Sequence, residues 1–101
     1  MIWIISGTQD GREIGAALAD REQSKPEGER REILMTVVSQ YGKVLAAHKG
    51  LDIEVGRFRE EDMLRVIREK GISLILDASH PYAAIVSETA RAACTLALIH
   101  L

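Results

Sequence analysis

The chain has 101 residues, a length that suits one small domain with a single hydrophobic core. Its apolar fraction of 47% argues against disorder, and its net charge of -2 with mixed signs excludes a strongly basic surface for nucleic acid. One cysteine excludes an intrachain disulfide and a four-cysteine metal site, and it fits a reducing compartment. The apolar stretch MIWIISG is too short to span a membrane and lacks the features of a signal peptide, so we expect a cytoplasmic protein with no membrane partner.

The chain begins with a predicted strand, a tight loop and a helix. Ile2 to Ser6 is a continuous apolar run, typical of a strand buried on both faces of a parallel sheet. A helix is predicted from about Asp10 to Gln23, because apolar residues recur there at helical spacing, at Ile14, Ala17 and Leu18. Lys25-Pro26-Glu27-Gly28 breaks this helix. The very polar stretch from Asp20 to Glu32 is expected to be a solvated helix end and loop.

The middle of the chain predicts two further strands around a short helix. Ile33 to Ser39 is rich in β-branched residues and is predicted to be a strand. Gln40-Tyr41-Gly42 is expected to form a turn, with one short helix between Gly42 and Gly50. Leu51 to Val55 alternates apolar and polar residues, as a short edge strand does.

The remaining residues predict a helix, a strand, a helix and a final strand. Glu60 to Lys70 has acids in its first turn and bases in its last, and Gly71 suits the stop. Ile72 to Leu76 is predicted to be a strand. A helix is then expected from Pro81 to about Leu96, followed by a strand from Ala97 to Leu101. This alternation predicts an α/β fold, with a parallel sheet of about four to five strands flanked by helices.

Three polar loops follow predicted strands and should therefore meet at one edge of the sheet. They are Ser6 to Arg12, Ser39 to Gly42, and Asp77 to Tyr82. In open α/β sheets, ligands bind at the carboxyl ends of the strands. The convergence of the loops is a stronger indication of a binding site than any one of them.

The first loop lies where a dinucleotide-binding fold places its phosphate turn. Its glycines, Gly7, Gly11 and Gly15, are spaced G-x-x-x-G-x-x-x-G, which differs from the standard dinucleotide motif. Thr8 offers a hydroxyl and Arg12 a cation for a phosphate near the helix start. The alternative is an ordinary strand-to-helix turn with Asp10 as the N-cap.

The second loop begins with Ser39-Gln40, has Lys43 nearby and contains no acid. An acid at this place would bind ribose hydroxyls, so its absence favours a cofactor that carries an extra phosphate there.

In the third loop, Asp77 ends a strand and Pro81 opens a helix. One interpretation is ligand contact by Ser79, His80 and Tyr82, with His80 able to handle a proton; the other is a helix cap with Asp77 as a loop brace.

Several single residues indicate structure and no chemistry. Cys94 and Trp3 are predicted to be core residues, and Glu60 to Asp62 form a helix start. His48 and His100 have no second ligand at metal spacing, so no metal site is expected.

Taken together, four motifs resemble the N-terminal half of the precorrin-6A reductase family, including its cobalt-precorrin-6A form. They are IWIISGTQDGREI, TVVSQYG, VGRFREEDM and LILDASHPYA, the last followed by an alanine-rich helix that contains Cys94. DASHPYA, residues 77 to 83, matches the family's D-A-[TS]-H-P-Y-A signature and is the most specific part of the resemblance.

The resemblance implies an NAD(P)H-dependent oxidoreductase of cobalamin biosynthesis that reduces one double bond of a tetrapyrrole (precorrin) by hydride transfer. It implies a Rossmann-like N-terminal domain, a second domain, and a ligand cleft between them, with NADPH expected as cofactor and NADH as the alternative. By position, the cofactor-binding residues are Gly7, Thr8, Asp10, Gly11, Arg12, Ser39 and Tyr41. The substrate-binding residues are Asp77, Ser79, His80, Pro81 and Tyr82.

The chain departs from the family in three respects. Ser6 stands where the family usually has the first glycine of Gly-Gly-Thr, and Gln23 to Glu32 is longer than the usual turn. Family members are also roughly twice as long. We therefore expect residues 1–101 to be a single N-terminal domain that lacks its C-terminal partner domain and has little reductase activity alone. The alternatives are a non-catalytic nucleotide-binding or regulatory domain and a flavodoxin-like module without a ligand.

Overall fold

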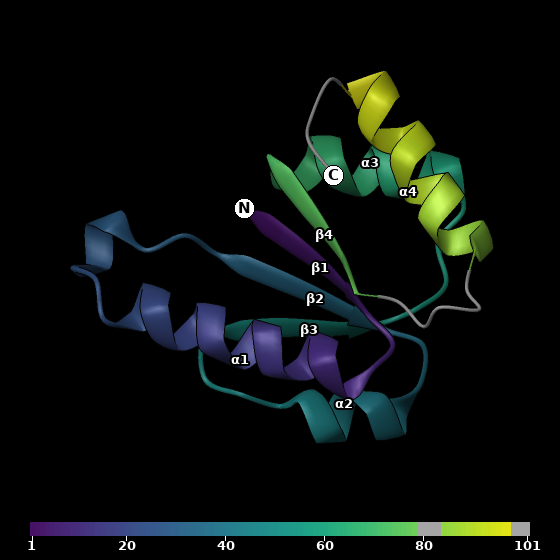
Figure 1. Ribbon diagram of the computed structural model, residues 1–101. Coiled ribbons are helices and arrows are strands. Elements are labelled where there is room, and N and C mark those ends of the chain that lie inside the picture. Colours follow the sequence, from purple (N-terminus) through teal and green to yellow (C-terminus); the bar gives the residue numbers. More distant parts are fainter. Residues whose placement is uncertain (79–83, 98–101) are drawn as a thin grey trace.

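The computed structural model describes residues 1–78 and 84–97, and within them it contains a four-stranded parallel sheet (Figure 1). The strands are β1 (Ile2–Ser6), β2 (Ile33–Val37), β3 (Leu51–Val55) and β4 (Leu74–Ala78), in the order β3-β2-β1-β4. In register, Ile2 of β1 pairs with Ile33 of β2 on one side and with Leu74 of β4 on the other. The predicted parallel sheet is confirmed.

Helices cover both faces of this sheet. They are α1 (Gln9–Gln23), α2 (Gln40–Ala46), α3 (Glu60–Lys70) and α4 (Ala84–Ala97), with a short 3-10 turn, η1 (Glu27–Glu29). Helices α1 and α2 lie on one face, and α3 and α4 on the other (Figure 1). The result is the Rossmann-like, three-layer α/β arrangement that the sequence predicts. None of the helices in the described residues is long and apolar enough to cross a membrane.

The central strand β1 divides the core into two clusters. All five of its residues are buried, and successive side chains point to opposite faces. Trp3 and Ile5 pack with α3 and α4, whereas Ile2 and Ile4 pack on the side of α1 and α2. Burial on both faces explains why β1 is a continuous apolar run.

Helix α1 packs on the sheet mainly through small residues, and only one of its three apolar residues at helical spacing, Leu18, contacts the core. Ile14 is 45% exposed and Ala17 is exposed, while the buried positions are Gly11, Gly15, Ala19 and Glu22. Small residues occupy the face toward the sheet because the helix lies very close to it: a Cβ on Gly15 would overlap the terminal methyl of Met35. The helix predicted from the spacing of Ile14, Ala17 and Leu18 is confirmed, and of these three residues only Leu18 is half-buried and packs against the core.

Some predicted boundaries were also wrong. Gln40 to Gly42, predicted to be a separate turn, form the first turn of α2. The helix starts here because the Ser39 hydroxyl accepts a hydrogen bond from the Gly42 backbone N–H at 3.0 Å. Helix α3 ends as predicted, with Gly71 left-handed at a φ of 66°. The backbone N–H of Ile72 then bonds to Ile67 at 3.0 Å, which delays the start of β4 to Leu74.

At the end of the chain, Ala97 is the last residue of α4 and does not begin a strand. Residues 98–101 lie outside the described residues, as does the predicted helix start at Pro81.

The polar stretch from Asp20 to Glu32 is mostly exposed, as predicted, with the exception of Glu22 near the end of α1, whose side chain is 7% exposed. Its carboxylate accepts a hydrogen bond from the Arg31 backbone N–H at 2.8 Å and lies 2.7 Å from the Lys25 ammonium. These two partners fold the long connection back onto the end of α1, just before β2 begins. The hydrogen bond with Lys25, and to a smaller extent the one with the Arg31 backbone, lower the pKa of Glu22 below its usual value, because both stabilise the charged carboxylate.

We expect Glu22→Gln to lower the urea midpoint of unfolding at neutral pH, because glutamine keeps the shape but loses the charge that faces Lys25. Because the pKa of Glu22 is lower in the folded chain than in the unfolded chain, its carboxylate stabilises the fold at pH values above the unfolded-state pKa of about 4.5. This stabilisation is lost as the pH falls through the folded-state pKa. The difference between wild type and variant should therefore shrink on acidification. Urea titrations at neutral pH and well below pH 4.5 measure this, with the exposed Glu29→Gln as matched control. An equal difference at both pH values would contradict the role of the charge.

Candidate functional site

The carboxyl ends of all four strands lie at the same edge of the sheet. Ser6, Val37, Val55 and Ala78 are the last residues of β1, β2, β3 and β4, and every pairing between these strands is parallel. The loops after β1 and β2 therefore meet at this edge, together with Asp77 near the end of β4. Ser79, His80, Pro81 and Tyr82 lie outside the described residues.

The loop between β1 and α1 is fastened to the end of β4. The Gly7 backbone N–H donates to the carbonyl of Ala78 at 3.2 Å. The Thr8 hydroxyl donates to the same carbonyl at 3.3 Å and accepts from the Gly11 backbone N–H at 3.1 Å. Thr8 is thus the N-cap of α1, and the alternative that gave this role to Asp10 is wrong. Asp10 is an exposed acid in the first turn of the helix.

A pocket of about 230 Å³ lies between this loop and the loop after β2. It is lined by Ser6, Gly7, Arg12, Val37, Val38, Ser39, Tyr41, Gly42 and Leu45. Of the seven residues predicted to bind the cofactor, the structure brings Gly7, Arg12, Ser39 and Tyr41 together here. Thr8 and Gly11 position the start of α1 behind the pocket, and Asp10 does not line it.

The chemistry of this pocket suits a phosphate. Arg12 supplies a positive charge, and no carboxylate is among the lining residues. The Ser39 hydroxyl already accepts from Gly42, but it keeps its own proton to donate. Nearby, the N-terminal turn of α1 adds N–H groups that have no partner within the helix, and the positive end of the helix dipole.

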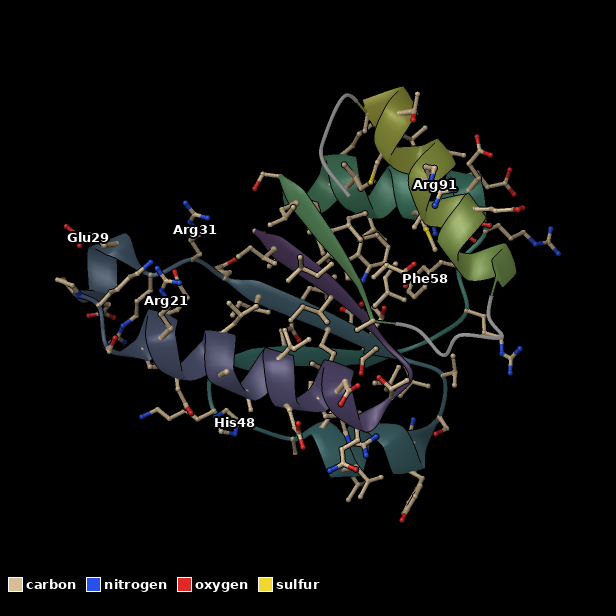
Figure 2. The ribbon with its side chains drawn as sticks, viewed as in Figure 1. Arg21, Glu29, Arg31, His48, Phe58 and Arg91 are labelled. Atoms are coloured by element: carbon tan, nitrogen blue, oxygen red, sulfur yellow. The ribbon has the colours of Figure 1, made fainter. Side chains whose placement is uncertain are left out.

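A second pocket, of about 290 Å³, adjoins the first on the side of β3. Its lining consists of Ile5, Ser6, Thr36, Val37, Val38, Gly56, Arg57, Phe58 and Met63. Phe58 lies on the face of the sheet that α3 and α4 cover (Figure 2). Sequence reasoning missed this pocket. The signal for it was present, because Gly56 to Phe58 follow a predicted strand and so must lie at the same edge.

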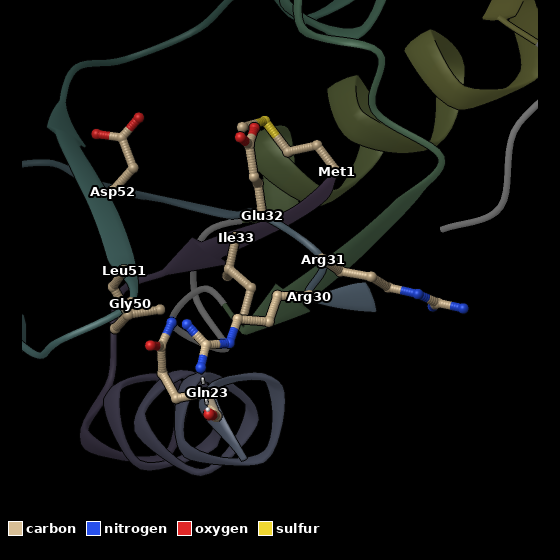
Figure 3. A pocket seen from close by; sticks show the side chains of 9 residues that line it. All are labelled: Met1, Gln23, Arg30, Arg31, Glu32, Ile33, Gly50, Leu51 and Asp52. Carbon is tan, nitrogen blue, oxygen red and sulfur yellow. Dashed lines mark hydrogen bonds between the residues drawn. The ribbon is translucent and has the colours of Figure 1, made fainter. Parts of the chain in front are cut away.

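The opposite edge of the sheet has a hollow of about 410 Å³ that is less suited to a ligand (Figure 3). The Arg30 guanidinium that faces it is engaged, since it donates to the backbone carbonyls of Gln23 and Lys25, each at 3.0 Å. Arg31 points away from the hollow in Figure 3, and Glu32 and Asp52 contribute carboxylates. Because ligands of open α/β sheets bind at the carboxyl ends of the strands, the candidate site is the edge with the two adjoining pockets.

Comparison with known proteins decides the family. The family described as precorrin-6x reductase CbiJ/CobK matches residues 1–101 of the chain. The chain belongs to this family. The resemblance predicted from the four motifs is thereby confirmed.

Two curated relatives of this chain carry the name cobalt-precorrin-6A reductase. The protein from Priestia megaterium is 32% identical over 90 residues, which cover 89% of this chain and 32% of the relative. The protein from Synechocystis sp. is 29% identical over 92 residues, which cover 90% of this chain and 32% of that relative. The chain thus spans about a third of the length of the curated relatives that it matches, so the expectation that family members are roughly twice as long was too low.

A solved structure named CobK precorrin-6A reductase has the same fold. It superposes with a TM-score of 0.74 and covers 99% of this chain and 36% of its own, with 23% sequence identity. At this identity the likeness supports the fold, and the Rossmann-like architecture predicted for the family is the one observed here.

The other groups singled out in the sequence of this family member are structural. Cys94 is buried, and burial raises the pKa of its thiol, as expected of a small core residue. His48 Nε2 lies 2.8 Å from the Asp20 carboxylate and so joins α1 to the loop after α2 (Figure 2). Among the described residues, no three His, Cys, Asp or Glu side chains are placed to hold a metal ion. His100 lies outside them.

Proposed function

We propose that this chain is the cofactor-side domain of a precorrin-6A or cobalt-precorrin-6A reductase that uses NADPH. The observation that carries the proposal is the pocket beside the start of α1, where Arg12 and Ser39 converge without a carboxylate. The names of the two curated relatives support the reaction, and their greater length supports a second domain that completes the cleft.

The residues of the first pocket fit the phosphates of a dinucleotide. Thr8 holds the start of α1 against β4, so that the helix presents its N–H groups at the edge of the sheet. Arg12 pairs with a phosphate and fixes its orientation. When bound, the nicotinamide of the cofactor supplies the hydride for reduction of the macrocycle.

NADPH is preferred over NADH because of the residues at the carboxyl end of β2. Folds that select the unphosphorylated cofactor place an acid there, which binds the ribose hydroxyls. This chain has Val38 and Ser39 at that place, with Arg12 on the other wall of the pocket. A phosphate on the ribose meets a hydroxyl and a cation there and no negative charge.

Asp77 is the described member of the proposed substrate-binding set. It is exposed near the carboxyl end of β4, on the far side of β1 from Ser39. We assign contact with the tetrapyrrole to Asp77 together with Ser79, His80, Pro81 and Tyr82. The cofactor and substrate contacts then lie on opposite sides of β1.

The test is a titration of the isotope-labelled chain with NADPH and, separately, with NADH, followed by amide NMR shifts. Shifts are expected from Gly7 to Arg12 and from Ser39 to Gly42, at lower concentrations of NADPH than of NADH. Arg12→Ala should weaken NADPH binding by about tenfold to a hundredfold, because a charge-assisted hydrogen bond contributes about 1.5–3 kcal/mol. Arg31→Ala, an exposed arginine at the opposite edge, is the matched control. Equal affinity of the Arg12 variant and wild type would contradict the proposed phosphate contact.

The same sample gives a second readout when the tetrapyrrole is added and NADPH oxidation is followed. We expect little or no turnover from residues 1–101 alone, because half a cleft orients the substrate poorly and misplacement costs rate heavily. Clear turnover would contradict the proposal that a second domain is required. Retained binding without reductase activity in a protein of full family length would favour a non-catalytic, regulatory domain.

A further inference from the structure

Ser6, the last residue of the central strand β1, carries a buried hydroxyl that the protein itself does not use. The side chain is 4% exposed, and the other buried polar residues of the described chain are Glu22 and Thr36. Both of those are hydrogen-bonded through their side chains. Within residues 1–78 and 84–97, the Ser6 hydroxyl has no hydrogen-bond partner. Because buried hydroxyl groups are nearly always paired, this exception calls for a physical reason.

The hydroxyl lies between the carboxyl edge of the sheet and the start of α1. Side chains of β1 alternate between the two faces, and Ile2 and Ile4 pack on the side of α1 and α2, so Ser6 points to that side as well. Its oxygen lies 2.7 Å from the position that a Cβ on Gly11 would take. The serine is thus wedged against the first turn of α1.

The same hydroxyl can be reached from the pockets at this edge. In the described part of the chain, every side-chain nitrogen or oxygen that is fully shielded from solvent has a hydrogen-bond partner. The unpaired Ser6 oxygen is therefore not fully shielded, and Ser6 lines both the first and the second pocket. A ligand that enters there meets a hydroxyl whose proton and lone pairs are all available.

The groups around the hydroxyl select an anionic acceptor. Arg12 lines the first pocket with Ser6, and no carboxylate is among the lining residues. The first turn of α1 adds N–H groups without partners in the helix. Thr8 cannot take the same role, because its hydroxyl already donates to the Ala78 carbonyl and accepts from the Gly11 backbone N–H.

We propose that Ser6 is a further ligand-contacting residue, whose hydroxyl donates a hydrogen bond to the pyrophosphate of the dinucleotide. This inference rests on the proposed function. The pyrophosphate is the group assigned here because Ser6 abuts the first turn of α1, whereas the extra phosphate on the ribose is placed at Ser39, after β2. The hydroxyl is unpaired in the empty chain and becomes paired when the phosphate binds, so Ser6 favours affinity at the expense of stability.

The test compares Ser6→Ala with wild type in titrations with NADPH, NADH and inorganic pyrophosphate. Affinity for both cofactors should fall by the same factor, about tenfold, because a hydrogen bond to a charged group is lost and both cofactors carry the pyrophosphate. Affinity for inorganic pyrophosphate should fall as well. Ser24→Ala is the matched control, since Ser24 is an exposed serine just after the other end of α1, and it should bind all three probes like wild type.

Urea unfolding gives a readout that a merely structural serine would not produce. Removal of an unpaired hydroxyl breaks no hydrogen bond of the empty chain, so the urea midpoint of Ser6→Ala should equal or exceed that of wild type. At one fixed concentration of NADPH, wild type should gain more stability than the variant, because it binds the cofactor more tightly. A lower midpoint with unchanged affinity would assign Ser6 to packing alone and overturn the contact.

The outcomes separate this inference from the proposed function. If Ser6→Ala binds both cofactors like wild type while Arg12→Ala binds them more weakly, the Ser6 contact is overturned and the proposed function stands. If Ser6→Ala loses affinity for NADPH alone, the hydroxyl faces the ribose phosphate, and the assignment to the pyrophosphate is overturned. If wild type binds neither cofactor, both the contact and the proposed function are overturned.

Discussion

Replacing Trp3 with alanine is expected to lower the free energy of unfolding by about 3–5 kcal/mol, the usual cost of truncating a buried tryptophan. Trp3 is fully buried in β1 and belongs to the cluster that joins the sheet to α3 and α4. Small domains are stable by only about 5–15 kcal/mol, so the variant would lose a large part of its stability. Urea unfolding followed by far-UV circular dichroism measures the loss, since the tryptophan signal itself is removed.

A milder pair of variants separates the ring from its hydrogen bond. Trp3→Phe keeps an aromatic ring but removes the donor to Thr36, whose hydroxyl is then buried without that partner. Adding Thr36→Val removes the unsatisfied group, and stability should partly return, because losing both partners costs less than losing one. A loss below about 1 kcal/mol for Trp3→Ala, or no recovery in the double variant, would contradict this account of the core.

Much of the fold could be predicted because a parallel sheet imposes simple patterns on the sequence. Ile2 to Ser6 is apolar throughout, since β1 is covered on both faces, and the charge order from Glu60 to Lys70 matches the dipole of α3. The face of α1 could not be predicted from apolarity. Its contact with the sheet depends on how closely two backbones approach, and Gly15 and Ala19 allow that approach without appearing in an apolar pattern.

The part of the candidate site that follows from strand topology could be predicted from the sequence. Parallel strands put Gly7, Arg12, Ser39 and Tyr41 at one edge, and the structure gathers them around one pocket. The roles of Thr8 and Asp10 could not be separated in advance, because both residue types cap helices well and the choice depends on where the loop meets Ala78. The second pocket was missed although Gly56 to Phe58 follow a predicted strand, and its wall formed by Met63 of α3 depends on packing that the sequence pattern does not show.

Gly11 is the position where a small change should affect both stability and cofactor binding. It lies in the first turn of α1, where the helix crosses the ends of β1 and β4. A Cβ added there would lie 2.7 Å from the Ser6 hydroxyl oxygen, 3.0 Å from the Ala78 Cβ and 3.3 Å from the Ala78 carbonyl oxygen. The last of these is backbone and cannot rotate away, so the helix start itself must move.

We therefore expect Gly11→Val to destabilise the chain by about 1–3 kcal/mol, the range typical of overpacking, and to weaken NADPH binding. Binding suffers because Thr8 and Arg12 move with the helix start. Ala17→Val is the control, since Ala17 is exposed on the same helix and reports the cost of a β-branched residue in α1 without a clash. Urea midpoints and NADPH titrations of both variants measure the two effects. Equal losses in the two variants would show that close packing at Gly11 is not the cause.

A double-mutant cycle identifies the contact responsible. Ser6 is 4% exposed, and its hydroxyl is the nearest group to the space beside Gly11, so the serine is part of the packing between β1 and α1. In the Gly11→Ala variant, adding Ser6→Ala removes the nearest clashing atom and should restore part of the lost stability, while the contact with Ala78 keeps the recovery incomplete. Contacting residues commonly show coupling of about 0.5–3 kcal/mol, whereas strict additivity of the two changes would mean that the helix start relaxes away from Ser6. Coupling of this sign would show that Ser6 and Gly11 pack directly against each other where β1 meets α1.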